Sequence, residues 1–163
     1  MTTTYMESHS VDGLTVDHKN LMISLKKVPV NSIILTRCLS ELSDADVNVD
    51  IITQTAPVKN AFDVSFIVLE RDLDKVKDIV NALGEEYPEI KITINKDITR
   101  LSVSGIGMRT QSGVAAKFFQ VLADNDVQIL MITTSEIRIS CIIKIEDTEK
   151  AVAATKEAFD LED

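Results

Sequence analysis

The chain has 163 residues, of which 45% are hydrophobic, which is enough for one ordinary domain or two small ones of roughly 70–80 residues. Its formal net charge is −9 and its basic residues form no stripe, so a phosphate backbone would be repelled. No apolar run approaches the roughly 20 residues that cross a bilayer, and no signal-peptide pattern opens the sequence. We therefore expect neither a nucleic acid nor a membrane as a partner.

The two cysteines, Cys38 and Cys141, lie inside apolar patterns. Two buried free thiols in a reducing cytoplasm are the simpler interpretation. A disulfide or a metal pair would need a C-x-x-C or Cys/His spacing, and His9 and His18 have no candidate ligands close to them in sequence. We expect a cytoplasmic protein with neither a metal ion nor a cofactor.

The first half of the chain alternates short strands with helices. Residues 1–9 are polar and are expected to be frayed or to derive from something upstream. Alternating apolar residues predict strands at 10–17 and 21–28, with a turn between them, and an i, i+3, i+4, i+7 apolar spacing predicts a helix over 33–45. Further strands are expected at 47–55, 62–69 and 90–94, and a helix is expected from the candidate N-cap Asp72 to about residue 86.

The second half repeats this pattern but ends one strand short. We predict a strand at 98–106, a loop at 107–112, a helix at 113–124, strands at 127–133 and 137–145, and a last helix that Asp147 caps. Within the repeat, residues 39–53 align with residues 119–133, always 80 positions further on. The leftover strand at 10–17 would supply the fourth strand of the second sheet.

These patterns predict an α+β fold of two ferredoxin-like βαββαβ domains, each an antiparallel four-stranded sheet with two helices on one face. The first domain is expected to span 21–95 and to be inserted in the second, which would comprise 10–17 plus 97–163. Without this nesting, the N-terminal strand would have unpaired backbone groups.

Residues 105–113, GIGMRTQSG, form the loop most open to a functional interpretation. Their G-x-G-x5-G spacing fits neither the dinucleotide fingerprint nor the phosphate loop of nucleotide-binding proteins. The start of a helix at Gly113 would present free N–H groups and the positive helix end, which suit a carboxylate. The alternative is that Gly113 serves only a tight strand-to-helix turn.

Other polar positions also have two interpretations. Residues 133–136, Thr-Thr-Ser-Glu, could hold an amino acid or simply close a hairpin. Asn48 and Gln128 are equivalent in the repeat, each at a strand start that we expect beside its unit's loop, and their amides could read a small ligand or be solvated. No catalytic constellation can be assembled from the sequence, so we expect no catalytic residues in this chain.

Residues 105–140, GIGMRTQSGVAAKFFQVLADNDVQILMITTSEIRIS, closely resemble the second ACT domain of aspartate kinase. In that family a G-M-[RK]-[ST]-x-x-G-V-A loop precedes a helix, and N-I-x-x-I-[ST]-T-S-E-I-[RK]-I-S follows it. Residues 11–20, VDGLTVDHKN, are similar to the family's V-x-G-[IL]-x-x-D-K-N segment, and residues 47–54, VNVDIITQ, to the I-N-[IV]-D-M-I-x-Q strand of the first ACT domain. The resemblance covers about residues 10–160 and implies a nested ACT pair.

The resemblance also implies a function. The family phosphorylates the side-chain carboxylate of aspartate with ATP, on the route to lysine, threonine and methionine. Its kinase domain precedes the ACT pair and has no counterpart in this sequence, so we expect either an excised regulatory region or a small subunit made from an internal start. That region would partner the kinase domain or a large catalytic subunit.

By the resemblance, ACT domains from two chains form a homodimer, and lysine or threonine binds at their interface. The effector contacts carried over, with Asn48 added through the repeat, are Met108, Gln111, Gly113, Val114, Ala115, Gln128, Ile129, Ser135, Asn48 and Gln54. In the first domain the family's D-K-P-G loop is replaced by Val-Asn-Ser-Ile at 30–33. An ammonium group without its carboxylate partner is costly to bury, so this loop predicts a reduced set of sites or a changed effector. The alternatives are a structural dimerisation module with degenerate sites and a stand-alone enzyme.

Overall fold

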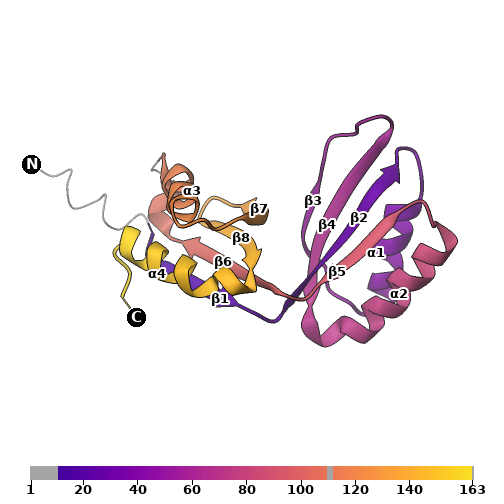
Figure 1. The fold of residues 1–163 in the computed structure, drawn as a ribbon, viewed down its shortest axis with the longest axis horizontal. Coiled ribbons are helices and arrows are strands. Elements are labelled where there is room, and N and C mark those ends of the chain that lie inside the picture. The colour runs from indigo at the N-terminus through magenta and orange to yellow at the C-terminus, as the bar shows by residue number, and fades with distance from the viewer. Residues whose placement is uncertain (1–10, 110–111, 163) are drawn as a thin grey trace, which may run out of the picture. The chain divides into compact units, whose positions relative to one another are not determined.

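The structure is a computed structural model that describes residues 11–109 and 112–162. The chain divides into two compact units. The inserted unit is Lys19–Lys96, and the outer unit combines the described residues up to His18 with those from Asp97 onward. Each unit is an antiparallel four-stranded sheet with its own two helices, as Figure 1 shows. The predicted α+β fold with one domain inserted in the other is confirmed.

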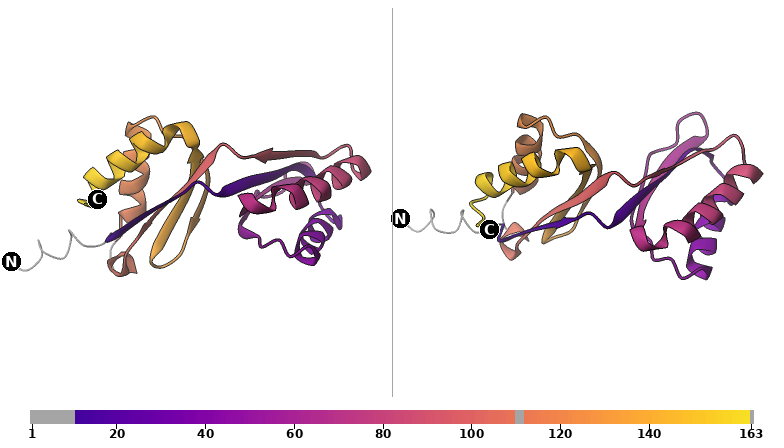
Figure 2. Two further views of the ribbon diagram at one scale, coloured as in Figure 1. Left: turned by 90° about the horizontal axis from the view of Figure 1, so that it is seen from below. Right: turned by 60° about the horizontal axis from the view of Figure 1, so that its bottom comes forward.

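The inserted unit has the predicted βαββαβ order. Its elements are β2 (Asn20–Pro29), α1 (Ile34–Asp44), β3 (Asp50–Gln54), β4 (Ala61–Leu69), the 3-10 turn η2 (Glu70–Asp72), α2 (Leu73–Glu86) and β5 (Lys91–Asn95). The strand order across the sheet is β3-β4-β2-β5, so β3 and β5 are the edges. Both helices lie on one face of the sheet, as Figure 2 shows.

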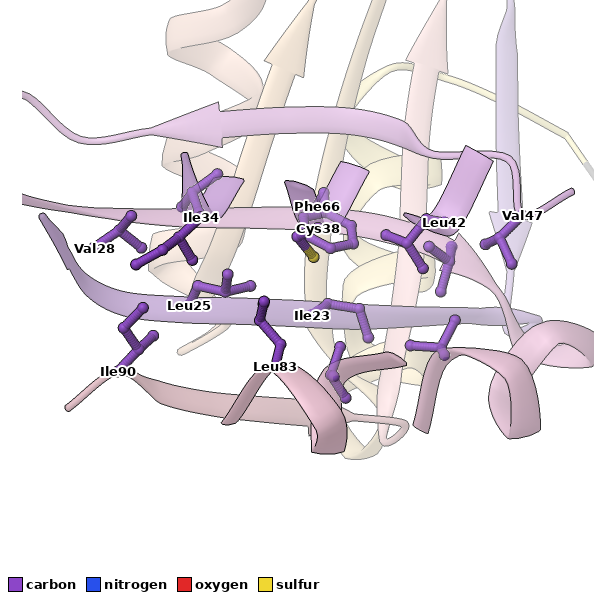
Figure 3. Packing of buried hydrophobic residues seen from close by; sticks show 14 of the residues in the cluster. Ile23, Leu25, Val28, Ile34, Cys38, Leu42, Val47, Phe66, Leu83 and Ile90 are labelled. Atoms are coloured by element: carbon purple, nitrogen blue, oxygen red, sulfur yellow. The ribbon is translucent and has the colours of Figure 1, made fainter. Parts of the chain in front are cut away.

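The core of the inserted unit lies between the sheet and these helices. Alternation directs Ile23 and Leu25 of β2 toward the helices, and Phe66 of β4 joins them. The periodic faces of α1 and α2 bring Cys38 and Leu83 into the same layer, which Figure 3 shows from close by. Each fully buried large apolar side chain in such a layer contributes about 1.5–3 kcal/mol relative to exposure.

The outer unit uses the N-terminal strand as its fourth strand. Its elements are β1 (Gly13–Asp17), β6 (Ile98–Ser104), the 3-10 turn η3 (Ile106–Arg109), α3 (Val114–Asp124), β7 (Ile129–Thr134), β8 (Arg138–Lys144), the 3-10 turn η4 (Ile145–Asp147) and α4 (Thr148–Ala158). The strand order is β1-β6-β8-β7. Leu14 of β1 is paired with Val103 of β6, so the leftover strand joins the second sheet as the count of strands required.

The second core repeats the first. Phe118 and Leu122 of α3 are fully buried against Leu101 and Cys141 of the central strands. Phe159, just after α4, packs its ring 6.4 Å from that of Phe118. The equivalent helix faces that the sequence predicted therefore serve the same purpose in the two units.

Two details differ from expectation. Asp72 and Asp147 stand at the N-caps of α2 and α4, but neither side chain makes a capping hydrogen bond, because a 3-10 turn leads into each helix. The strand that we expected at 137–145 begins one residue later, at Arg138, and Ile137 before it is 45% exposed. No helix in the described part of the chain is long and apolar enough to cross a membrane.

Candidate functional site

The start of α3 has the geometry that favours a glycine. Gly113 is the N-cap of α3 with φ 96° and ψ −6°, a conformation that L side chains rarely adopt. The Gly113 carbonyl accepts the first helical hydrogen bond, from the N–H of Lys117 at 2.9 Å. The N–H groups of the first helical turn have no partner within the helix, and no acidic side chain lies in that turn. This end of α3 is therefore positive and suits an anionic group.

The predicted neighbours of Gly113 that the structure describes belong to the second core or pack against it. Val114 is 8% exposed and belongs to the core, while Ala115 and Met108 are partly buried against it. The Met108 N–H bonds the Gly105 carbonyl at 3.2 Å within η3. These three residues shape the loop chiefly through packing. Gln111 lies outside the described residues.

The turn before β8 lies at the same end of the sheet as this loop. The Gly105 N–H donates to the Ile137 carbonyl at 2.9 Å, which ties the end of β6 to that turn. Ser135 is exposed, and its N–H donates to the Arg138 carbonyl at 2.8 Å. The expected hairpin is therefore present, and the Ser135 side chain faces solvent at the end of the sheet where α3 begins.

Gln128 and Ile129 lie at the opposite end. Ile129 at the start of β7 pairs with Ile143, whereas Thr134 at its end pairs with Ile139. Gln128 directly precedes β7 and follows the end of α3. The expectation that Gln128 lies beside its unit's loop is therefore wrong: α3 and β7 run in opposite directions, so the strand starts at the far end of the sheet.

The inserted unit has the same division. Gln54 ends β3 and pairs with Val64, near the end of the sheet where β2 leads into α1. Asn48 precedes β3, at the other end, so it too lies away from its unit's loop. Both amide side chains are exposed. No single unit brings the whole predicted set together.

The loop of the inserted unit differs from its counterpart at the helix start. The N-cap of α1 is Ile33, with φ −91°, and its side chain is 68% exposed. Asn31 has φ 68°, so the chain makes its left-handed turn two residues earlier than at Gly113. The Ser32 hydroxyl donates to the Pro29 carbonyl at 2.7 Å. A branched side chain therefore borders the helix end where the other unit has no side chain at all.

Each sheet also presents an uncharged or nearly uncharged edge. β7 reads ILMITT, and β3 reads DIITQ with Ile52 52% exposed. Both strands carry a bulge near their start, and Ile51 in the β3 bulge has φ 40°. Exposed edges without charges are templates for pairing with another strand.

Sequence reasoning missed a hydrogen-bond chain in the outer unit. The Thr148 hydroxyl donates to the Ile145 carbonyl at 2.7 Å, and the hydroxyl of the fully buried Thr99 lies 2.7 Å from it. His18 Nδ1 lies 3.0 Å from the same Thr99 oxygen. If Thr99 donates to Thr148, its oxygen accepts from His18, so this arrangement assigns the proton to Nδ1. The spacing of these three residues in the sequence gives no signal from which these hydrogen bonds could be predicted.

Burial governs the titration of both thiols. Removal from water raises the pKa of Cys38 to about 11 and that of Cys141 to about 12. Neither forms a disulfide, and because of these raised pKa values both stay protonated and unreactive at neutral pH.

The Arg37 guanidinium hydrogen-bonds Glu86 and lowers the pKa of that carboxyl. Among the described residues, no three His, Cys, Asp or Glu side chains group as metal ligands.

Comparison with known proteins identifies the family that the chain resembles. An ACT domain family model matches residues 101–159. The aspartate kinase of Pseudomonas fluorescens (strain SBW25) is 30% identical over 157 residues, which are 96% of this chain and 38% of that relative. The chain therefore spans well under half the length of the curated relatives it matches.

Solved structures match over the whole fold. The ligand-free regulatory subunit of aspartate kinase from Thermus thermophilus is 29% identical with a TM-score of 0.84, over 92% of this chain and 99% of that one. A structure of aspartokinase alpha and beta subunits is 31% identical with a TM-score of 0.82, over 93% of this chain and 99% of that one. The chain thus belongs to the aspartate kinase family, as a regulatory region built from ACT domains.

Proposed function

We propose that the chain senses lysine or threonine at an interface between ACT domains of two copies. The observation that carries the proposal is the division of the candidate residues between the two ends of each sheet. Gly113 and Ser135 lie at one end of the outer unit, and Gln128 and Ile129 at the other. A ligand that contacts both groups needs two domains.

If the β7 edges of two copies paired across a two-fold axis, the two groups of candidate residues would come together. Antiparallel edge strands place the start of each strand beside the end of the other. Gln128 of one copy would then approach a loop end of its partner. The uncharged sequence of β7 and the exposed Ile52 of β3 are compatible with edges that pair.

The chemistry of an amino acid suits the loop end. The effector carboxylate would accept hydrogen bonds from the free N–H groups after Gly113 and would meet the positive end of α3. The Gln128 amide and the Ser135 hydroxyl would bond the effector's amino group or side chain. A carboxylate bound by a positive helix end needs no metal or cofactor.

The consequence would be control of a distant kinase site. The chain would associate with a kinase domain or a large catalytic subunit in the cytoplasm and regulate phosphorylation of aspartate on the route to lysine, threonine and methionine. Effector binding would favour one arrangement of subunits and thereby shift the population of the active kinase. The coupling free energy in such systems is typically about 1–3 kcal/mol.

A second candidate function is structural dimerisation with degenerate sites. The loop at 30–33 favours it for the inserted unit, because the family's acid, proline and glycine are missing and Ile33 borders the helix end. Under this alternative the paired edges would persist and no amino acid would bind. The two functions make opposite predictions for ligand-dependent stability.

Calorimetric titration of the chain with lysine, threonine and methionine tests the proposal. A ligand at 100 times its dissociation constant should add about 2.7 kcal/mol to the free energy of unfolding. Gln128→Ala should weaken binding without changing the fold, whereas Asn81→Ala, which removes an exposed amide on α2, should not. No stabilisation by any of the three amino acids would favour the structural module.

Sedimentation of edge variants tests the interface separately. Thr133→Lys adds a charge to β7 and should shift the chain toward monomer. Thr15→Lys places the same charge on β1, the opposite edge of the same sheet, and should leave assembly unchanged. Equal behaviour of the two variants would contradict pairing through β7.

A further inference from the structure

The strand that leads to the first loop contains a bulge that the other unit lacks. The pairing of β2 with β4 is regular up to Leu25 and resumes at Val28. The bulged Lys27 has φ 62°, and its N–H donates to Asp63 Oδ1 at 3.0 Å. The equivalent pairing of β6 with β8 runs without a break. Bulges re-aim side chains and are enriched next to functional sites.

A second lysine in a rare conformation follows in the β3–β4 hairpin. The Val58 N–H donates to the Ala61 carbonyl at 2.8 Å, and the Ala61 N–H returns the bond at 3.1 Å. This closes a two-residue turn with Lys59 at φ 52° and Asn60 at φ 63°, the pattern of a type I′ turn. Glycine and asparagine are the usual residues with positive φ, so a lysine there carries a backbone cost.

The two lysines border the same hollow of about 510 Å³. Its lining is Lys27, Thr55, Ala56, Val58, Lys59, Ala61, Phe62 and Asp63. Among the described residues, neither lysine ammonium has an ion-pair partner. One Asp63 oxygen already accepts the backbone N–H of Lys27. The hollow therefore holds two cations against one carboxylate, on a chain whose net charge is −9.

We propose that this hollow binds a small dianion, with Lys27 and Lys59 each contributing an ammonium group. The remaining walls are mostly apolar, from Val58 and Phe62 and the alanines beside them, and would contact a short carbon body. Two like charges at one hollow repel until an anion lies between them, and a dianion satisfies both at once. The ligand needs no amino group, which distinguishes this site from the amino-acid site proposed above.

Titration with two dianions and a neutral analogue tests the site. The probes are succinate, inorganic phosphate and succinamide, which matches succinate in size but has no charge. Backbone amide shifts of Lys27 and Lys59, followed by NMR on the whole chain at low salt, report binding at the hollow. Saturation by succinate alone identifies a dicarboxylate site, and saturation by phosphate alone identifies a phosphate site; both support the proposal.

Matched variants tie the binding to the two lysines. Lys27→Asn and Lys59→Asn each introduce a residue that tolerates positive φ and remove one positive charge. Each should lower the affinity for the dianion at least about tenfold. Lys77→Gln removes an exposed charge from α2 of the same unit and should leave affinity unchanged. Binding of succinamide as tight as succinate, equal weakening by Lys77→Gln, or no saturation by either dianion would overturn the proposal.

Discussion

Replacement of Gly113 by alanine should destabilise the outer unit through its backbone alone. A Cβ at this position would meet nothing within 4 Å, so a steric clash with neighbouring atoms contributes nothing. The φ of 96° remains, and a non-glycine residue in this region costs about 1–2 kcal/mol. We expect Gly113→Ala to lower the free energy of unfolding of the outer unit by this amount and to weaken amino-acid binding at α3.

Gly84 provides a control of opposite sign. It lies inside α2, where a Cβ would meet Ile92 Cδ1 at 3.8 Å, an ordinary van der Waals contact. Alanine is favoured over glycine within a helix by about 0.5–1 kcal/mol, so Gly84→Ala should stabilise the inserted unit.

Native-state hydrogen exchange measures both effects. It reports α3 and α2 separately, which matters because two units need not unfold in one step. Protection should fall in α3 for Gly113→Ala and rise in α2 for Gly84→Ala. Unchanged or increased protection of α3 in Gly113→Ala would refute the argument from backbone conformation.

Three further outcomes are expected. Leu122→Ala removes a fully buried side chain from the second core and should cost about 2–5 kcal/mol, measured by urea unfolding. The free energy of unfolding should fall as the pH rises above about 9, because the thiols of the unfolded chain ionise near 9 whereas the buried thiols of Cys38 and Cys141 stay protonated up to their raised pKa values. The loss should be about 1.4 kcal/mol per pH unit for each thiol. A Cys38→Ala, Cys141→Ala double variant should flatten this pH profile, and an unchanged slope in that variant would contradict the assignment to the thiols. Thr99→Val should cost about 1–3 kcal/mol and move the NMR signal of the His18 Nδ1 proton, while Thr99→Ser should restore both.

The fold was predictable because its pattern is repeated and its strands can be counted. The helix periodicity located α1 and α3 within about a residue, and equivalent positions such as Leu42 and Leu122 are fully buried in both units. The need of each sheet for four strands then placed β1 beside β6. These inferences use hydrophobic burial and backbone pairing, which a single sequence expresses strongly.

The candidate site was less predictable because a repeat shows equivalence but not direction. Gln128 aligns with Asn48, yet the alignment cannot say which end of the sheet either residue occupies. The bulge at Lys27 was hidden for a different reason. Lysine is not a residue that marks a positive φ, so no glycine or asparagine signals the turn.

The nesting of the two units has a consequence for the order of folding. Leu14 of β1 pairs with Val103 of β6, although the whole inserted unit lies between them in the sequence. During synthesis β1 therefore leaves the ribosome well before its partner strand. Closing a flexible loop of roughly 80 residues costs on the order of 4 kcal/mol in chain entropy. The ends of the inserted unit are already neighbours once Met22 pairs with Asn95, so its prior folding removes most of that cost. We therefore expect the inserted unit to fold first, and the N-terminal strand β1 to pair with β6 only afterwards.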